Sequence, residues 1–508
     1  MRTEGGTFGL GGTRGASGPA GGSGATGLGP KVGETVERFE LEKAWLVDPV
    51  SGREGPGEVV VIDGILESVT WLEGAEAEGV TDKGVVVAPG FFDIHAHFRE
   101  PGFEDAETVA TGSAAAAHGG YTTVALMPNT QPALDEPGTL ARVRSAVAAS
   151  GSPVEILAYG AVSAGRGGEQ LSAMGELADA GVIGYSDDGA PVKTPKLLRS
   201  ALLYAGMLGL PIVEHPEDLE LTAGAEAHEG YVASVMGLAG WPTAGEVSAV
   251  SRDLAVLADA LGDQPGARLH LTHLSTAPAL DLVRRARAAG LPVTCDVTPH
   301  HLAFTDEWIA GARRWAWDAL AADGTSRDPW IDGALTAGPY NTSLRVNPPL
   351  ATAADAAACL AALVDGTASA VATDHAPHTI VDKEVEFGKA SNGISGIETA
   401  LGVLLALVDA GKLPLARAIA ALTTGPAAVM AAGGHAAGSA PARPRGLTEG
   451  AAADLVVFDR ADGWKVTSDS LLSKGKNSPL IGRELPGRVL LTIAAGRLAY
   501  EDPSAGDE

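Results

Sequence analysis

The sequence is short of cysteine, of positive charge and of long apolar runs, and each shortage excludes a class of protein. Two cysteines among 508 residues provide neither a disulfide framework nor a thiolate zinc site. Lysine and arginine number 36 against 63 acidic residues, a net charge of −27, whereas nucleic-acid binding needs a basic surface. No apolar run reaches the roughly 18 residues of a membrane span, and no signal-peptide core begins the chain. We therefore expect a cytoplasmic protein that binds neither nucleic acid nor membrane.

The two ends of the chain differ in composition from the middle. Residues 1–36 are rich in Gly, Ser, Ala and Thr, which predicts a disordered tail without a function. Short β-type segments follow in 37–88, where Asp63-Gly64 is a hairpin-turn signal, and a matching set occupies 441–500. We expect these two flanks to form one small β-sandwich domain around the central segment 89–440.

The central segment alternates short apolar strands with Ala- and Leu-rich helical stretches. This alternation predicts an α/β fold with a parallel sheet, and eight strands fit a (β/α)8 barrel of the TIM type. The Trp-, Gly- and Asp-rich stretch 308–343 breaks the rhythm and is expected to be a long loop or lid, or an insertion without a role. The eight predicted strands are 91–97, 122–127, 154–160, 182–186, 212–215, 269–273, 293–297 and 370–374.

The first predicted strand carries a pattern that is typical of a metal site. His95 and His97 point to the same face because side chains alternate along a strand. Arg99 follows two residues later, and its guanidinium fork binds carboxylates through two hydrogen bonds. The pattern therefore predicts a metal beside a carboxylate-bearing substrate. Because the chain is acidic overall, such a substrate needs a local cation, which Arg99 provides.

Other predicted strands also end in metal-ligand residues. A barrel of this kind has its active site at the carboxyl ends of the strands, so these side chains meet at one rim. Imidazole and carboxylate ligands suit zinc, with manganese or cobalt as substitutes, and six of them suit two metals bridged by a carboxylate. The strand ends concerned are His95 and His97, Asp187-Asp188, His215, His273 and Asp374.

Each of these residues also has a structural interpretation. A single histidine at a strand end is more often hydrogen-bonded within the fold than bound to metal, and Asp-Asp-Gly is ordinary turn chemistry. The shared position at strand ends is what favours the metal interpretation. Four other histidines lack such a position and are expected to be structural or exposed: His118, His228, His270 and His435.

Several stretches resemble the amidohydrolase superfamily, and specifically the bacterial class I dihydroorotases. The similarity extends from about residue 38 to 500 and excludes the tail and the 308–343 stretch. The matching stretches are 89–102, 119–130, 186–189, 297–301, 346–350 and 372–378. The most specific parts are Arg99-Glu100-Pro101-Gly102, Met127-Pro128-Asn129-Thr130 and Thr373-Asp374-His375-Ala376-Pro377-His378.

The resemblance implies a role for each ligand residue and two zinc ions per subunit. His95 and His97 would hold the first ion, and His215 and His273 the second. Asp188 is favoured over Asp187 as the bridging ligand because of its spacing from the strand-five histidine. Asp374 would bind the first ion and act as general base and acid.

The resemblance also implies a reaction and a substrate pocket. The reaction is the reversible cyclisation of N-carbamoyl-L-aspartate to (S)-dihydroorotate in pyrimidine biosynthesis, by a metal-activated hydroxide. Arg99 and Asn129 would grip the substrate carboxylate. Family members usually carry Phe or a similar residue at position 392. The resemblance therefore implies a contact with the backbone of Asn392 and not with its side chain. The implied pocket residues are His97, Arg99, Asn129, Asn347, His378, Asn392 and Gly393.

Two other functions compete with this interpretation. Hydantoinases and allantoinases use a carboxylated lysine at strand four, where this chain has none nearer than Lys193. A metal-free subunit that only scaffolds aspartate transcarbamoylase should have lost ligands, but every ligand position is filled. We expect a homo-oligomer, and an active enzyme could still bind that transcarbamoylase as a partner.

Overall fold

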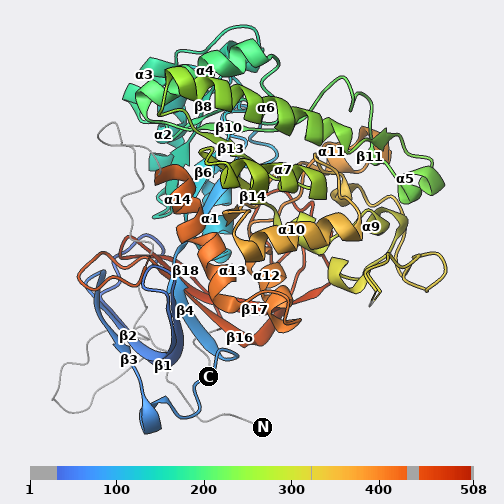
Figure 1. Cartoon of the computed structure of the whole chain (residues 1–508). Coiled ribbons are helices and arrows are strands. Elements are labelled where there is room, and N and C mark those ends of the chain that lie inside the picture. Colours follow the sequence, from blue (N-terminus) through green and yellow to red (C-terminus); the bar gives the residue numbers. More distant parts are fainter. Residues whose placement is uncertain (1–30, 322, 432–445, 505–508) are drawn as a thin grey trace, which may run out of the picture.

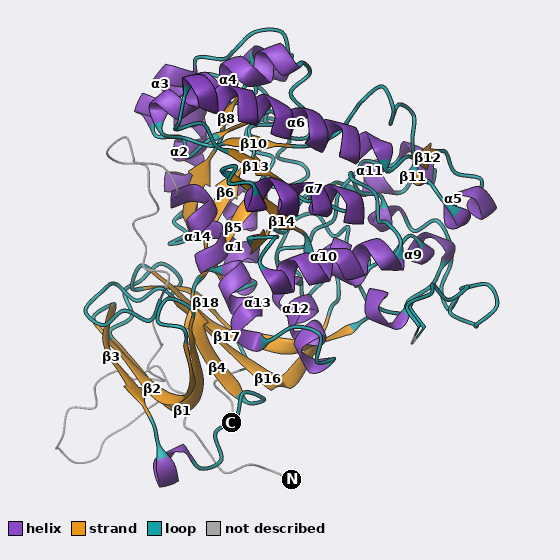
Figure 2. Cartoon of the chain, in the orientation of Figure 1, coloured by secondary structure: helices purple, strands orange, loops and turns teal. Residues whose placement is uncertain are grey.

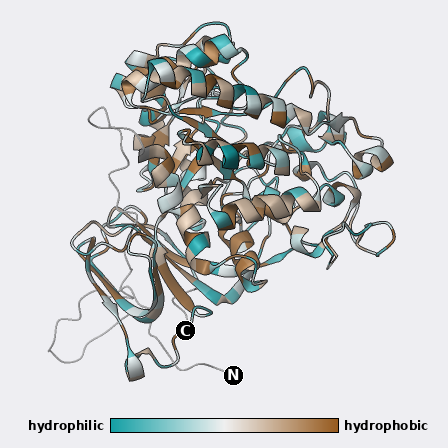
Figure 3. Ribbon diagram, viewed as in Figure 1, coloured by the Kyte–Doolittle hydropathy of each residue, from teal (hydrophilic) through white to brown (hydrophobic). Residues whose placement is uncertain are grey.

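The computed structural model describes residues 31–504 except 322 and 432–445, and the chain forms an α/β unit joined to a β-sheet unit (Figure 1). Strands lie inside the α/β unit and helices lie outside them (Figure 2). The outer helices alternate hydrophilic and hydrophobic residues, as expected for helices with one buried face (Figure 3). No helix of the described residues combines the length and apolar character that crossing a bilayer requires.

The α/β unit contains two parallel sheets, so the predicted fold class is confirmed at this level. Each predicted strand overlaps an observed one, and the segment 154–160 overlaps two. One sheet has the order β5-β6-β7 and the other β15-β14-β13-β10-β9-β8. The bounds are β5 (Phe91–Ala96), β6 (Tyr121–Leu126), β7 (Glu155–Ala158), β8 (Gly160–Ala161), β9 (Tyr185–Ser186), β10 (Ile212–Glu214), β13 (Leu269–Leu271), β14 (Val293–Val297) and β15 (Ala370–Val371).

The two parallel sheets approach each other at both ends. β7 leads into β8 through a single residue, and a parallel bridge joins Ala96 to His375, just beyond β15. The backbone N–H of His97 donates to the carbonyl of His375 at 2.9 Å. The first and last strand ends of the α/β unit are therefore neighbours, although almost 280 residues separate them.

Threonine caps begin several helices of the α/β unit. The Thr108 and Thr352 side chains each accept a hydrogen bond from a backbone N–H three residues on, which satisfies an otherwise unpaired donor. The helices are α1 (Val109–His118), α2 (Pro137–Ser150), α3 (Met174–Ala180), α4 (Pro195–Leu208), α5 (Tyr231–Met236), α6 (Ala244–Asp263), α7 (Ala277–Ala288), α8 (Pro299–Ala303), α9 (Glu307–Ala310), α10 (Ala353–Asp365), α11 (Ile380–Lys383), α12 (Ala400–Asp409), α13 (Leu415–Leu422) and α14 (Thr424–Ala431). A small parallel pair, β11 (Ala227–His228) and β12 (Gly240–Trp241), lies near α5.

The two flanks of the chain join in one sheet, so they form the single β unit that was expected. Its order is β18-β17-β16-β4-β1-β2-β3. β4 pairs in parallel with β1 and antiparallel with β16, and this pairing links the two flanks edge to edge. The bounds are β1 (Arg38–Asp48), β2 (Arg53–Ile62), β3 (Ile65–Trp71), β4 (Val85–Pro89), β16 (Leu455–Lys465), β17 (Glu484–Ala494) and β18 (Arg497–Glu501).

The start of this unit differs slightly from the expected boundary. Thr35 forms a bridge with Arg497 and Val36 is fully buried, so the sheet unit begins before residue 37. The expected tail lies outside the described residues as far as residue 30. The predicted hairpin at Asp63-Gly64 is confirmed, because both residues have positive φ and Ile62 pairs with Ile65 across the turn.

Strand β4 and the first half of β16 are buried on both faces. Val86 and Phe458 pack into the core of the α/β unit, whereas Val87 and Val457 pack into the core of the sheet unit. Alternation along the strands places neighbouring residues on opposite faces. The same two strands therefore belong to both hydrophobic cores.

The 308–343 stretch is anchored at its start and more exposed further on. Trp308 is fully buried, and the Arg483 guanidinium lies 5.3 Å from its ring and 4.0 Å from that of Trp315. Ile331 in the outer part is 83% exposed. Tyr340 Oη donates to the Met236 carbonyl at 2.7 Å, which attaches the end of the stretch to α5. The stretch is thus mostly irregular, as the composition predicts, and the buried Trp308 anchors its first part.

Candidate active site

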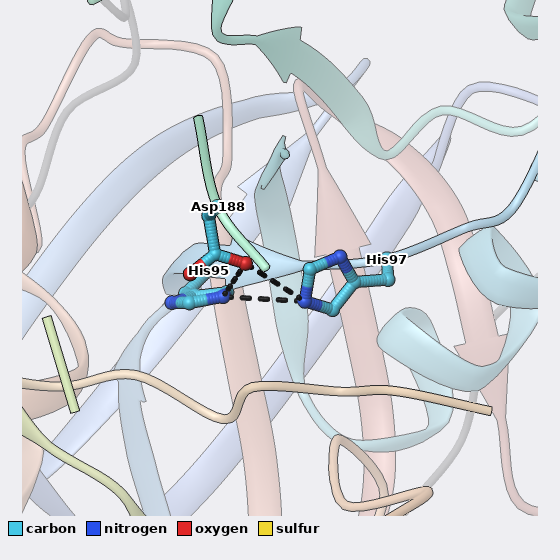
Figure 4. A group of neighbouring side chains, drawn as sticks. All are labelled: His95, His97 and Asp188. Carbon is cyan, nitrogen blue, oxygen red and sulfur yellow. Dashed lines mark hydrogen bonds and ion pairs between the residues drawn. The ribbon is translucent and has the colours of Figure 1, made fainter. Parts of the chain in front are cut away.

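The end of β5 brings two imidazoles and a carboxylate together (Figure 4). His95 and His97 have their Nε2 atoms 3.2 Å apart, and Asp188 Oδ2 lies 3.2 Å from His95 Nε2. All three side chains are buried, and their ligand atoms are close enough together to hold one metal ion. The two histidines therefore face the same point, as the alternation of side chains along a strand predicts.

A second group forms on the other side of the same aspartate. His215 Nδ1 lies 2.9 Å from His273 Nε2, and Asp188 Oδ1 lies 3.5 Å from each. Asp188 thus belongs to both groups. Asp187 points away, since its Oδ1 accepts a hydrogen bond from the Ser163 backbone N–H at 3.0 Å.

Hydrogen bonds behind the rings fix which nitrogens carry protons. Thr272 Oγ1 donates to Asp296 Oδ2 at 3.1 Å, so it accepts the Nδ1 proton of His95, 2.7 Å away. His95 Nε2 is then the nitrogen whose lone pair can face a metal ion. The same follows for His97, whose Nδ1 lies 2.9 Å from the acceptor Asn129 Oδ1.

In the second group, His215 follows the same rule. His215 Nε2 lies 3.0 Å from Glu217 Oε2, a carboxylate oxygen that can only accept. His215 Nδ1 is therefore a lone pair that faces His273 and Asp188. Among the described residues, Asp188 Oδ1 and His273 Nδ1 have no hydrogen-bond partner.

These lone pairs fit a metal ion. Nitrogen ligands about 2.0–2.1 Å from a tetrahedral zinc lie roughly 3.3 Å from each other, close to the 2.9 and 3.2 Å between the paired ring nitrogens. Buried lone pairs and carboxylates that meet without a hydrogen between them repel one another. A cation at each group removes that repulsion, and the nitrogen and oxygen donors suit zinc.

The electrostatic field of the cluster also favours positive charge. Burial disfavours a charged imidazole, but the carboxylates of Asp188 and Asp374 overcome it and raise the pKa of His95 to about 9. Burial is likewise overcome at His215, where Asp188 and Glu217 raise the pKa to about 10. A field that holds a proton this firmly attracts a metal cation in the same place.

Asp374 completes the first group from the end of β15. Its Oδ1 lies 3.1 Å from His97 Nε2 and 3.5 Å from His95 Nε2. Burial opposes ionisation, but these histidines hold the pKa of Asp374 well below its usual range, so the side chain is a carboxylate. Asp93 Oδ1 accepts from the Thr373 backbone N–H at 3.0 Å and supports the turn before Asp374.

Three site residues adopt a left-handed backbone that side chains rarely occupy. Arg99 has φ 62°, His273 has φ 40° and Asp374 has φ 46°. Such conformations cost of order 1–3 kcal/mol each and persist where the surrounding structure imposes them. The strand ends therefore turn sharply at the residues that face the cluster.

A cavity of about 170 Å³ opens beside the two groups. It brings together all seven residues expected to bind substrate and five of the six expected ligands, His95 lying behind the wall. Its lining is His97, Arg99, Asn129, Asp188, Gly189, His215, His273, Asn347, Asp374, Ala376, His378, Asn392 and Gly393.

Arg99 is a partly buried cation with most of its donors available. Burial lowers the pKa of Arg99 to about 10, so the guanidinium stays charged at neutral pH. Its Nε donates to the Pro377 carbonyl at 3.1 Å. His378 Nε2 lies 2.7 Å from the Asn392 carbonyl and therefore donates there, which prevents it from accepting from Arg99 Nη2 at 3.3 Å. The outer nitrogens of Arg99 are left to meet a carboxylate in the cavity.

Asn392 presents its backbone to the cavity, and its side chain is engaged elsewhere. Arg345 Nε donates to Asn392 Oδ1 at 3.0 Å, and the Gly393 N–H donates to the Arg345 carbonyl at 2.8 Å. Asn347 Nδ2 donates to Glu217 Oε2 at 2.8 Å. At position 392, where the chain departs from the family pattern, the asparagine is thus held by Arg345, 47 residues earlier in the chain.

Sequence reasoning missed four residues that support the site: Glu217, Thr272, Asp296 and Arg345. Glu217 lies two positions after His215, so the alternation applied to His95 and His97 was a usable signal. Asp296 stands inside β14 and had no such signal, because a strand residue can face either way. Asp296 also accepts from His270 Nε2 at 2.8 Å, which gives that histidine a structural partner. His435 lies outside the described residues.

Comparison with known proteins gives relatives along the chain. Residues 84–278 match a family model described as Dihydro-orotase-like. The dihydroorotase of Anaeromyxobacter dehalogenans strain 2CP-1 is 43% identical over 467 residues, 92% of this chain and 98% of the relative. The dihydroorotase of Pelotomaculum thermopropionicum is 39% identical over 460 residues, 90% and 97% of the two chains. Among solved structures, the L-hydantoinase of Arthrobacter aurescens has a TM-score of 0.70 at 22% identity, covering 90% of this chain and 95% of its own, and shares the fold.

Proposed function

Since this chain belongs to the dihydroorotase family, we propose that it catalyses the reversible cyclisation of N-carbamoyl-L-aspartate to (S)-dihydroorotate, a step of pyrimidine biosynthesis. One observation carries the assignment to this substrate: the charged Arg99 fork and the two ligand groups share a cavity of about 170 Å³. A carboxylate held by Arg99 would set the adjoining amide beside the ligand groups. We place the chain in the class I branch of the amidohydrolase superfamily.

We propose that the two parallel sheets form one closed (β/α)8 barrel. The bridge between Ala96 and His375 and the direct passage from β7 to β8 support closure. We also propose that the seven-stranded sheet folds over its own core as a sandwich, since residues from both of its ends share one buried cluster.

We propose two zinc ions per subunit, held by the residues that the sequence predicted. The first would be bound by His95, His97 and Asp374, the second by His215 and His273, with Asp188 shared. Bound zinc lowers the pKa of a water molecule and polarises a substrate carbonyl.

The side chains around the cavity supply binding and proton transfer. Arg99 and Asn129 would hold the substrate carboxylate, and the Asn392-Gly393 backbone would close the opposite wall. Asp374 Oδ1 would take a proton from the attacking water and return it to the leaving ring nitrogen. In the cyclisation direction the same oxygen would take the proton from the ureido nitrogen.

A hydantoinase-like reaction is the competing assignment. Hydantoinases resemble this chain in fold, but at 22% identity the likeness does not extend to substrate. Lys193, the nearest lysine to the end of β9, donates from Nζ to the Gly167 carbonyl at 2.5 Å and is absent from both ligand groups. The filled ligand positions argue equally against a catalytically silent subunit.

A substrate panel tests the proposal. Purified protein with its metal content determined is assayed with dihydroorotate, hydantoin and allantoin, before and after chelation. We expect metal-dependent hydrolysis of dihydroorotate alone. Preferential hydrolysis of hydantoin or allantoin would transfer the assignment to the competing class, and no activity with metal bound would support the silent subunit.

Three expectations about the cellular setting stay predictions: a homo-oligomer, association with aspartate transcarbamoylase, and a cytoplasmic location. Light scattering of the purified chain, alone and mixed with that transcarbamoylase, measures the first two.

A further inference from the structure

One oxygen atom connects a ligand of the second metal group to the substrate cavity. Glu217 Oε2 lies 3.0 Å from His215 Nε2 and accepts a hydrogen bond from Asn347 Nδ2 at 2.8 Å. His215 faces Asp188 and His273 with its other nitrogen, and Asn347 lines the cavity. The two partners come from segments more than 130 residues apart.

The other oxygen of Glu217 anchors the carboxylate. Oε1 accepts from Thr222 Oγ1 at 2.6 Å and from Trp241 Nε1 at 3.2 Å. Glu217 is buried, and four donors surround its two oxygens. Only a carboxylate accepts on both atoms, because an amide would place its own donors against His215 and Asn347 or against the indole. The surroundings therefore select an acidic residue here.

We propose that Glu217 is a positioning residue that couples metal binding at His215 and His273 to substrate binding at Asn347. Its hydrogen bond keeps the His215 proton on Nε2 and the ligand lone pair on Nδ1. The same oxygen fixes the amide of Asn347 against the cavity. This inference rests on the proposed function for its substrate half and on the ligand geometry alone for its metal half.

The test measures zinc binding directly, without substrate. Zinc is titrated calorimetrically into chelator-treated wild-type, Glu217→Gln and Glu217→Ala proteins. We expect Glu217→Ala to weaken one zinc equivalent about 10- to 100-fold, as loss of such supporting groups does, and to leave the other equivalent near wild type. Glu217→Gln keeps the shape and one acceptor, so its loss should be smaller. In the assay, both variants should raise KM for dihydroorotate by more than their loss of thermal stability accounts for.

Two matched variants separate coupling from packing. Thr222→Val removes a donor to Oε1 only and should bind zinc like wild type. Asn347→Ala should raise KM while zinc affinity stays unchanged. Wild-type zinc binding in both Glu217 variants, or an equal loss in Thr222→Val, would overturn the proposal. A wild-type protein inactive on dihydroorotate would refute the proposed function instead, since the zinc comparison does not involve substrate.

Discussion

At the scale of single residues, the groups behind the histidines matter as much as the histidines. Thr272, Asn129 and Glu217 each occupy the outer nitrogen of one ring and leave the inner nitrogen bare. The sequence predicted the rings from their spacing on strands, but it could not predict Thr272 and Asn129 as their partners. These two arrive from distant segments, and their direction depends on side-chain rotamers that no spacing encodes.

The neighbouring aspartates provide the most direct test of metal binding. Asp188→Asn should lose most of the bound metal, because Asp188 is common to both ligand groups. Asp187→Asn should retain it, because Asp187 is turned toward Ser163. Metal analysis after dialysis measures both. Equal metal content in the two variants would contradict the shared-ligand assignment.

Arg99 is expected to act on substrate and not on metal. Arg99→Met removes a charge-assisted contact worth about 1.5–3 kcal/mol, so KM should rise about 10- to 100-fold. Metal content should stay at the wild-type level. Arg99→Lys keeps the charge without the fork, so its KM should lie between those of wild type and Arg99→Met. A normal KM in Arg99→Met would reject the substrate role.

Asp374 is expected to control the chemical step. Asp374→Asn keeps the shape but cannot take up a proton, so kcat should fall about 10²- to 10⁴-fold. Steady-state kinetics on protein of measured metal content separates this effect from metal loss. Substantial turnover by metal-loaded Asp374→Asn would count against the base role.

At the scale of secondary structure, the sequence predicted which segments form strands but not how long they are. Apolar runs identified all eight strand segments of the α/β unit. β9 and β15 nevertheless pair over only two residues each, because their ends turn to present Asp188 and Asp374. β3 was predicted only through the Asp63-Gly64 turn, because just one of its seven residues is buried and it lacks the apolar run that marked the others.

A buried lysine at the end of α11 predicts a pH-dependent stability. Lys383 Nζ donates to the Ser391 and Thr342 carbonyls at 2.5 and 3.1 Å, joining the loop that carries Asn392 to the segment before Asn347. Burial, reinforced by nearby arginines, lowers the pKa of Lys383 from 10.5 to about 7. Between these values the unfolded chain binds more protons, so this group makes the free energy of unfolding rise with pH.

Urea unfolding between pH 7 and 10 checks this sign. The stability of wild type minus that of Lys383→Met should increase with pH across this range. Lys389→Met serves as the control, since its ammonium is exposed beside Glu386 and should give a difference that is independent of pH. A flat difference for Lys383→Met would contradict the depressed pKa.

At the scale of the whole molecule, the sequence predicted that the two flanks meet but not how. Two β-rich flanks predicted one domain, and the pairing of β4 with both β1 and β16 makes it one sheet. Strand order depends on contacts between residues far apart in the chain, which composition does not report. The sequence did not predict that Trp308 anchors the 308–343 stretch, for the same reason. Its partner Arg483 lies in the C-terminal flank, far away in the chain.

Shared strands predict that the two units unfold together. Phe458 is fully buried in the core of the α/β unit although it belongs to the sheet unit. Phe458→Ala should cost about 3–5 kcal/mol and lower the midpoint of a single thermal transition. Met207→Ala, at a residue 72% exposed on α4, should change stability by no more than about 0.5 kcal/mol. Two separate transitions in calorimetry would contradict a common core.

The pairing of β4 with β16 affects how the protein folds during its synthesis. The ribosome synthesises β4 early and β16 late. One edge of β4 therefore stays unpaired while most of the polypeptide emerges. An open strand edge attracts any other strand it meets. The nascent polypeptide is therefore exposed to misassociation at that edge until β16 has left the ribosome.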